Sequence, residues 1–115
     1  HTGLTGLEVV GSMHERRQRM HELSNAFLAL PGGLGTFEEL FEVLSWAQLG
    51  LLGKPCGILN IGGYFDFLPD LLDRGIASGL IKEQFRSYPL FVDSNVDRLL
   101  QTLTKAVAPP QGEIR

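Results

Sequence analysis

The sequence has a single cysteine, Cys56, among its 115 residues. One cysteine excludes an intrachain disulfide and also a zinc site built from several thiolates of the same chain. A chain without disulfides suits a reducing compartment, and its first residues lack the basic, apolar and small-residue regions of a signal peptide. We therefore expect a cytoplasmic protein.

The sequence also lacks an excess of positive charge and a long apolar run. Its net charge is −3 and its isoelectric point is near 5.5, so no basic surplus is present to neutralise a polynucleotide backbone. Its apolar stretches fall far short of the roughly 20 residues that cross a bilayer. These absences argue against a nucleic-acid partner and against a membrane partner. The hydrophobic content of 43% is ordinary for one globular domain.

Short apolar runs alternate with amphipathic stretches along the chain. The continuous apolar run at residues 26–30 is typical of a strand buried on both faces of a sheet, and the mainly apolar segments at residues 55–61 and 88–92 predict two further strands. A stretch with helical spacing follows each run, and another, at residues 6–23, precedes the first. We expect an α/β fold with a Rossmann-like, doubly wound parallel sheet joined by right-handed crossovers.

Local signals predict where the helices begin and end. Thr5 and Glu8 have the S/T-x-x-E spacing of a capping box, which predicts the start of the first helix. Thr36 is expected to cap the helix that follows the first apolar run, and Gly50 or Gly53 to mark its end. The letters SNVD predict the cap of the last helix.

The sequence begins in a stretch rich in threonine and glycine that is typical of the middle of a domain. We expect residues 1–107 to form the C-terminal part of a single nucleotide-binding domain, whose sheet lacks its first strands. Residues 108–115 are expected to be a flexible tail, because proline and glycine dominate their start.

A glycine-rich segment, PGGLGTFEE at residues 31–39, joins the first apolar run to a predicted helix. Ligands of open α/β sheets bind at such positions. The glycines let backbone N–H groups approach an anion, the helix N-terminus adds partial positive charge, and Thr36 supplies a hydroxyl. The segment fits a phosphate, although a plain tight turn has the same pattern. Without the Walker A lysine or G-x-G-x-x-G spacing, it indicates neither an ATPase nor an NAD dehydrogenase.

Three segments in register resemble the Lonely Guy family. Residues 31–39 match its P-G-G-x-G-T-x-x-E signature, residues 13–17 are similar to its M-H-x-R-K segment, and residues 45–49 to its T-W-A-Q-L helix. The resemblance extends over about residues 1–103 and omits the family's first strand and its glycine-rich nucleotide loop. Members of this family, often labelled lysine decarboxylases, are phosphoribohydrolases that release a free base, notably a cytokinin, from a nucleoside 5′-monophosphate. The resemblance implies this activity, with cytokinin or adenine as the base and with no cofactor.

The family's catalytic arginine and glutamate fall on Arg16 and Glu39. Glycosidic cleavage builds positive charge on the ribose, so Glu39 is expected to stabilise that charge and to position or deprotonate a water. Arg16 suits the phosphate or the leaving base, although its pattern alone indicates a solvated helix face. The expected substrate-binding residues are Arg17, Gly33, Leu34, Gly35, Thr36, Glu38 and Ser45.

Several of these assignments have alternatives. Arg17 and Ser45 stand where the family has Lys and Thr, and they keep the charge and the hydroxyl. Glu38 is expected either to contact ribose hydroxyls or to act only as an acidic residue at a helix start. His14 and His21 lie on one predicted helix without a third ligand, so no metal site is expected.

The second predicted helix carries more apolar residues than one core-facing stripe requires, among them Phe37, Phe41, Trp46 and Leu49. Burial within one monomer is one explanation. The Lonely Guy family forms homodimers in which this region lies at the interface and partner residues approach the site. The resemblance therefore implies a homodimer with the site near its interface.

Two other functions are alternatives to hydrolysis. The same fold family includes a molybdenum-cofactor carrier, so the alternative is a non-catalytic nucleotide or molybdenum-cofactor binding protein. The decarboxylase label would require a lysine that forms a Schiff base with pyridoxal phosphate. Lys54, Lys82 and Lys105 all occupy ordinary loop or helix-end positions in the predicted fold, which argues against that chemistry.

Overall fold

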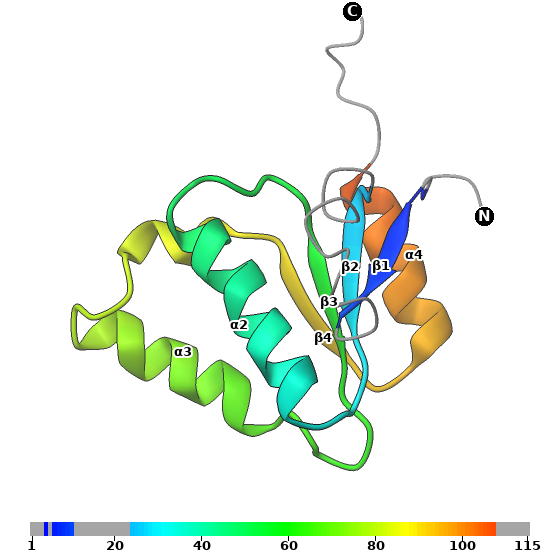
Figure 1. Cartoon of the computed structure of the whole chain (residues 1–115), viewed down its shortest axis with the longest axis horizontal. Helices are drawn as coiled ribbons and strands as arrows, with labels where there is room; N and C mark the ends of the chain where they lie inside the picture. Colours follow the sequence, from blue (N-terminus) through cyan, green and yellow to red (C-terminus); the bar gives the residue numbers. More distant parts are fainter. Residues whose placement is uncertain (1–3, 5, 11–23, 108–115) are drawn as a thin grey trace, which may run out of the picture.

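The computed structural model describes residue 4, residues 6–10 and residues 24–107 of the chain. Its elements are, in order, β1 (Leu7–Val9), β2 (Ala26–Ala29), α2 (Leu34–Gln48), β3 (Cys56–Leu59), α3 (Phe67–Ala77), the 3-10 helix η2 (Glu83–Ser87), β4 (Leu90–Asp93) and α4 (Val96–Ala106). Figure 1 shows α2 and α3 on one face of the sheet and α4 on the other. The predicted α/β fold with a Rossmann-like parallel sheet is confirmed.

The described strands form one parallel sheet in the order β1-β2-β3-β4. In this register Phe27 lies beside Cys56, and Cys56 lies beside Leu90. Because the strands are parallel, the segments that leave β2, β3 and β4 all start at the same edge of the sheet (Figure 1). This carboxyl edge is where open α/β sheets bind ligands.

The sheet separates two apolar cores, because successive side chains of a strand point to opposite faces. Phe27 and Ile58 belong to the core beneath α2 and α3, whereas Leu28 belongs to the core beneath α4. Strands covered on both faces are apolar throughout. This explains why apolar sequence predicted β2 and β3 correctly. The prediction at residues 88–92 also found β4, although the observed strand, Leu90–Asp93, begins and ends later.

Gly57 on β3 allows α4 to pack closely against the sheet. A Cβ atom at this position would lie 2.9 Å from Cδ1 of Leu103 and 3.1 Å from Cδ1 of Leu99. Both leucines are fully buried. The missing side chain of Gly57 therefore provides the space into which the apolar face of α4 fits.

The first predicted helix is wrong at its beginning. Residues Leu7–Val9 form β1, and Glu8 pairs in register with Phe27 of β2. Glu8 is therefore a strand residue with a buried side chain, and not part of a capping box. Pairing with β2 gives the backbone of β1 hydrogen-bond partners and outweighs a four-residue cap pattern. Thr5 and residues 11–23, the rest of that prediction, lie outside the described residues.

The end of α2 confirms one of the two predicted stop signals. Gly50 has a φ of 78°, a left-handed conformation that glycine adopts without strain. Its N–H donates to the carbonyl of Ala47 at 3.1 Å, and the N–H of Leu51 donates to that of Trp46 at 2.9 Å. This pair of bonds is a Schellman motif, which satisfies the last carbonyls of the helix.

Within the described part of the chain, no helix has the length and apolar character needed to cross a membrane.

Candidate functional site

The glycine-rich segment leaves β2 at the carboxyl edge of the sheet and continues directly into α2 (Figure 1). Gly33 is the N-cap residue, and its carbonyl accepts the N–H groups of Thr36 at 3.1 Å and Phe37 at 3.2 Å. The preceding N–H groups, of Leu34 and Gly35, have no acceptor within a helix. Leu34 is 85% exposed, so solvent reaches this end of α2. Free N–H groups and the positive end of the helix dipole form a site suited to an anion.

Thr36 does not cap α2 as predicted but lies in its first turn. The N-cap residue Gly33 has an extended backbone and makes no side-chain cap. The helix therefore begins before Thr36. The hydroxyl of Thr36 instead faces the preceding loop. A Cβ atom on Gly32 would lie only 2.4 Å from Oγ1 of Thr36. The missing side chain of Gly32 therefore leaves room for the Thr36 hydroxyl, whose contact with a phosphate stays a prediction.

Glu39 and Glu38 occupy different environments on α2. Glu39 is fully buried, at 0% exposure, whereas Glu38 is exposed to solvent. A carboxylate removed from water interacts more strongly with nearby charge than an exposed one. Burial therefore favours Glu39 over Glu38 for stabilising charge in a reaction.

Glu8 is a second buried carboxylate, which the sequence analysis assigned to a helix cap. It is 1% exposed and lies beside Phe27 in the sheet, so its side chain faces the same side as α2. In the sequence, the signal for this residue is a single charged side chain between the apolar residues Leu7 and Val9. Glu8 is thus a second carboxyl group buried on the side of the sheet that α2 covers.

The remaining predicted residues are not all brought together. Ser45 lies about 16 Å along α2 from Leu34, given the rise of an α-helix, and borders a groove between α2 and α3. The structure does not place it beside the glycine-rich segment, and its contact with substrate stays a prediction. Arg16 and Arg17, together with His14 and His21, lie outside the described residues.

The loop between β3 and α3 supplies site residues that the sequence analysis missed. The hydroxyl of Tyr64 donates a hydrogen bond to the carbonyl of Gly32. The Tyr64 ring stacks on Phe37 with a centroid distance of 5.9 Å and an interplanar angle of 18°. No local sequence pattern links this loop to the glycine-rich segment, so Tyr64 could not be predicted as a site residue.

An apolar groove with a volume of about 460 Å³ runs between α2 and α3. Phe41 from α2 and Leu71 from α3 border it, and they are 39% and 46% exposed. Of the surplus apolar residues predicted on α2, Phe41 and Leu49 are exposed, whereas Phe37 and Trp46 are partly buried. The additional apolar residues of α2 therefore lie partly on the surface and partly in the core.

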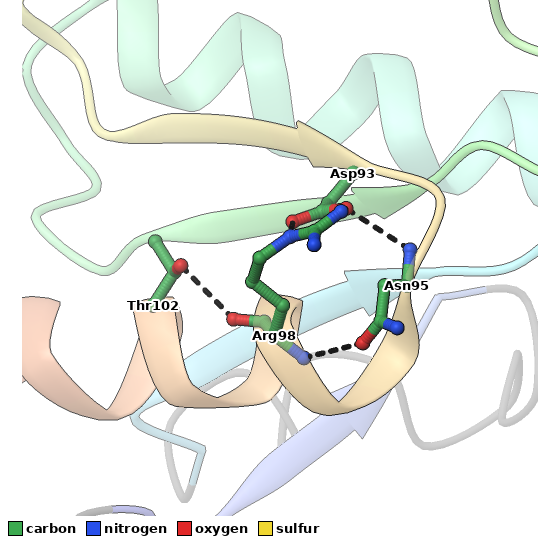
Figure 2. Close-up of polar contacts among 4 residues, drawn as sticks. All are labelled: Asp93, Asn95, Arg98 and Thr102. Carbon is green, nitrogen blue, oxygen red and sulfur yellow. Dashed lines mark hydrogen bonds and ion pairs between the residues drawn. The ribbon is translucent and has the colours of Figure 1, made fainter.

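The end of β4 also lies at the carboxyl edge and carries an ion pair, which Figure 2 shows. Nε and Nη2 of Arg98 each donate to the Asp93 carboxylate at 2.7 Å. The Asn95 side chain accepts the backbone N–H of Arg98 at 2.8 Å and caps α4, as the SNVD letters predicted. Hydrogen bonds from Arg98 and from the Asn95 backbone lower the pKa of Asp93 to about 2.

Asp93→Asn is expected to lower the melting temperature by a few degrees near neutral pH. The folded pKa is lowered, so the ionised carboxylate stabilises the fold above its ordinary pKa of about 3.9. This stabilisation is lost as the pH falls towards 2, and the two melting temperatures should converge there. Thermal unfolding followed by circular dichroism between pH 7 and pH 2 measures the difference. Asp97→Asn, an acidic residue in the first turn of α4, is the matched control. An equal loss in that variant would contradict a specific role for the ion pair.

All three lysines of the sequence lie at the edge of the sheet opposite the glycine-rich segment. Lys54 precedes β3, and Lys82 precedes η2 and β4. Lys105 is in the last turn of α4, which runs back towards the amino ends of the strands (Figure 1). A Schiff-base lysine would have to lie at the carboxyl edge together with the anion site. This placement argues against pyridoxal-phosphate chemistry at that edge.

Comparisons with known proteins agree with the motif resemblance. A sequence model of the family described as possible lysine decarboxylase matches residues 1–103. The chain is 53% identical over 95 residues to a probable cytokinin riboside 5′-monophosphate phosphoribohydrolase of Oryza sativa subsp. japonica, which covers 81% of this chain and 41% of that protein. It is 47% identical over 105 residues to a cytokinin riboside 5′-monophosphate phosphoribohydrolase of Arabidopsis thaliana, covering 89% of this chain and 45% of that protein.

A bacterial relative gives the same result. The cytokinin riboside 5′-monophosphate phosphoribohydrolase of Rhodococcoides fascians is 49% identical over 87 residues, covering 76% of this chain and 44% of that protein. The chain thus spans less than half the length of each of these relatives.

Proposed function

Because the chain belongs to the family described as possible lysine decarboxylase, as its resemblance to Lonely Guy proteins predicted, we propose that it hydrolyses a nucleoside 5′-monophosphate. The products are a free base and ribose 5-phosphate. Relatives that carry the name cytokinin riboside 5′-monophosphate phosphoribohydrolase support the proposal. A cytokinin riboside monophosphate or AMP is the proposed substrate.

The observation that carries the proposal is that α2 holds both an anion site and a buried carboxylate. The N–H groups of Leu34 and Gly35 are available at its start, and Glu39 follows on the same rigid helix. Gly35 and Glu39 are separated by about 6 Å along the helix axis, given the rise of an α-helix. That separation is comparable to the span of a ribose between its 5′-phosphate and its anomeric carbon.

In the proposed reaction, the 5′-phosphate binds at the start of α2 and fixes the position of the ribose. The bond between the anomeric carbon and the base nitrogen breaks, and positive charge develops on the ribose. The Glu39 carboxylate stabilises that charge and takes a proton from the water that bonds to the anomeric carbon. The departing base carries away the electron pair of the broken bond and takes up a proton from solvent, while Glu39 returns the proton from the attacking water to solvent. Arg16 is proposed to stabilise the negative charge on this base or on the phosphate.

Free-base release tests the function directly. AMP and isopentenyl-AMP are incubated with the protein, and chromatography measures the free base and the ribose 5-phosphate. We expect equal amounts of both products from the preferred nucleotide and far slower release from adenosine, which lacks the phosphate. A folded protein that binds nucleotide without releasing base would support the non-catalytic alternative, either nucleotide or molybdenum-cofactor binding.

We also propose that the protein is a homodimer whose interface covers the groove between α2 and α3. The exposed apolar residues Phe41 and Leu71 border this groove, and their burial against a second copy would remove apolar surface from water. Light scattering coupled to gel filtration measures the molar mass. A value of a single 12.7 kDa chain at micromolar concentration would contradict the proposal.

A further inference from the structure

Tyr64 connects two segments that lie far apart in the sequence. Its hydroxyl donates to the carbonyl of Gly32, 32 residues away, and its ring stacks on Phe37 in α2. Tyr64 is 43% exposed, so its ring is not held only by burial in a core. The contact links the loop after β3 to the glycine-rich segment after β2 at the carboxyl edge of the sheet.

The loop after β3 is built to hold Tyr64 in this position. Gly62 and Gly63 have φ values of 62° and 77°, which turn the chain sharply before Tyr64. The side chain of Asn60 accepts the N–H of Phe65 at 2.7 Å, and Phe65 itself is fully buried. The loop is therefore fixed by its own contacts, independently of the hydroxyl of Tyr64.

The hydrogen bond from Tyr64 controls the orientation of one peptide group in the glycine-rich segment. The Gly32 carbonyl and the Gly33 N–H belong to the same planar trans peptide, in which they point in opposite directions. Holding the carbonyl against Tyr64 therefore directs the Gly33 N–H away from Tyr64. Without this bond, the peptide between two adjacent glycines would have more conformational freedom. Oγ1 of Thr36 lies against Gly32 as well and restricts the same peptide.

We propose that Tyr64 is a positioning residue for the 5′-phosphate, because its hydroxyl fixes the peptide between Gly32 and Gly33 so that the Gly33 N–H joins the anion site at the start of α2. This inference rests on the proposed function, which places the phosphate at that helix start. Tyr64 itself touches neither the phosphate nor the reacting atoms in this arrangement. Its effect is to reduce the rearrangement that phosphate binding requires.

Tyr64→Phe removes the hydroxyl and keeps the ring that stacks on Phe37. Losing one neutral hydrogen bond is expected to weaken binding of inorganic phosphate and of AMP by about 3- to 10-fold. The shifts of the Gly33, Leu34 and Gly35 amide signals on titration, followed by NMR, measure this affinity. In turnover, KM for AMP should rise by a similar factor, while kcat changes less and the slow release from adenosine is unaffected.

Tyr88→Phe is the matched control. The Tyr88 hydroxyl also donates to a backbone carbonyl, that of Lys54, but at the opposite edge of the sheet. This variant is expected to lower thermal stability and to leave phosphate affinity unchanged. A melting curve for each variant separates loss of folding from loss of affinity.

The outcomes distinguish this inference from the proposed function. Wild-type protein that neither binds phosphate at the start of α2 nor releases base would overturn both. Wild-type binding together with unchanged affinity in Tyr64→Phe would overturn only the role of Tyr64. An equal loss of affinity in Tyr88→Phe would show a general effect of stability, and would likewise overturn it.

Discussion

Replacing Glu39 with Gln is expected to slow free-base release from a nucleoside 5′-monophosphate by about 10²- to 10⁴-fold, the usual contribution of a positioned acid–base group. Gln has nearly the same size as Glu, so it fits the fully buried position. It carries no negative charge to stabilise the ribose and cannot take the proton of the attacking water. The affinity for AMP should change little, because the proposed phosphate contacts lie at the start of α2. Single-turnover rates and separate binding titrations measure the two quantities.

Glu38→Gln provides the matched control for this prediction. Glu38 precedes Glu39 on α2, but its side chain is exposed to solvent. The same chemical change at this position is expected to alter the rate by only a few fold. Equal losses at the two positions, or full activity in Glu39→Gln, would contradict the proposed role of Glu39. Such a result would mean that another group stabilises the charge on the ribose and takes the proton of the attacking water.

Phe27→Ala is expected to lower the free energy of unfolding by about 3–5 kcal/mol. Phe27 lies in β2, with β1 on one side and β3 on the other, and its side chain is fully buried beneath α2 and α3. Truncation removes apolar burial and leaves a cavity that paired strands cannot close. A loss of this size is a large part of the 5–15 kcal/mol by which domains are usually stable. Urea unfolding followed by circular dichroism measures it.

Phe67→Ala is the corresponding control on the protein surface. Phe67 begins α3, is 43% exposed, and contacts the ring of Phe37 edge-on. Removing the same side chain here exposes little new apolar surface, and the loss should be less than half of that at Phe27. Similar losses at both positions would mean that the core beneath α2 and α3 adapts to the cavity, contrary to its close packing.

The strands were predictable because burial on both faces leaves a pattern that no helix on the surface has. The run that contains β2 is apolar without interruption, and the residues of β3 itself, CGIL, are apolar, since α2 and α3 cover one face and α4 the other. β1 was missed because a strand of three residues is too short to show a period. The capping-box spacing of Thr5 and Glu8 also overlaps this strand by coincidence. Only its pairing with β2, which sequence alone does not show, defines it as a strand.

The candidate site was predictable where its parts are local. The glycine-rich segment and Glu39 lie within nine consecutive residues, so a motif could identify them together. The contact between Tyr64 and Gly32 joins two loops that meet only because β2 and β3 are neighbours in the sheet. The start of α2 was displaced because Gly33 caps the helix without a side chain, a signal weaker than that of Thr36.

The purely parallel order of the described strands determines how this chain must acquire its fold. Phe27 meets Cys56, and Cys56 meets Leu90, so the ladders β2–β3 and β3–β4 each close a loop of roughly 30 residues before their first hydrogen bond forms. No hairpin can nucleate such a sheet, and folds dominated by distant pairings form slowly. α2 and α3 shorten these loops as they become helical, so we expect helix formation to assist strand pairing. During synthesis, β3 keeps an open, aggregation-prone edge until β4 has emerged from the ribosome.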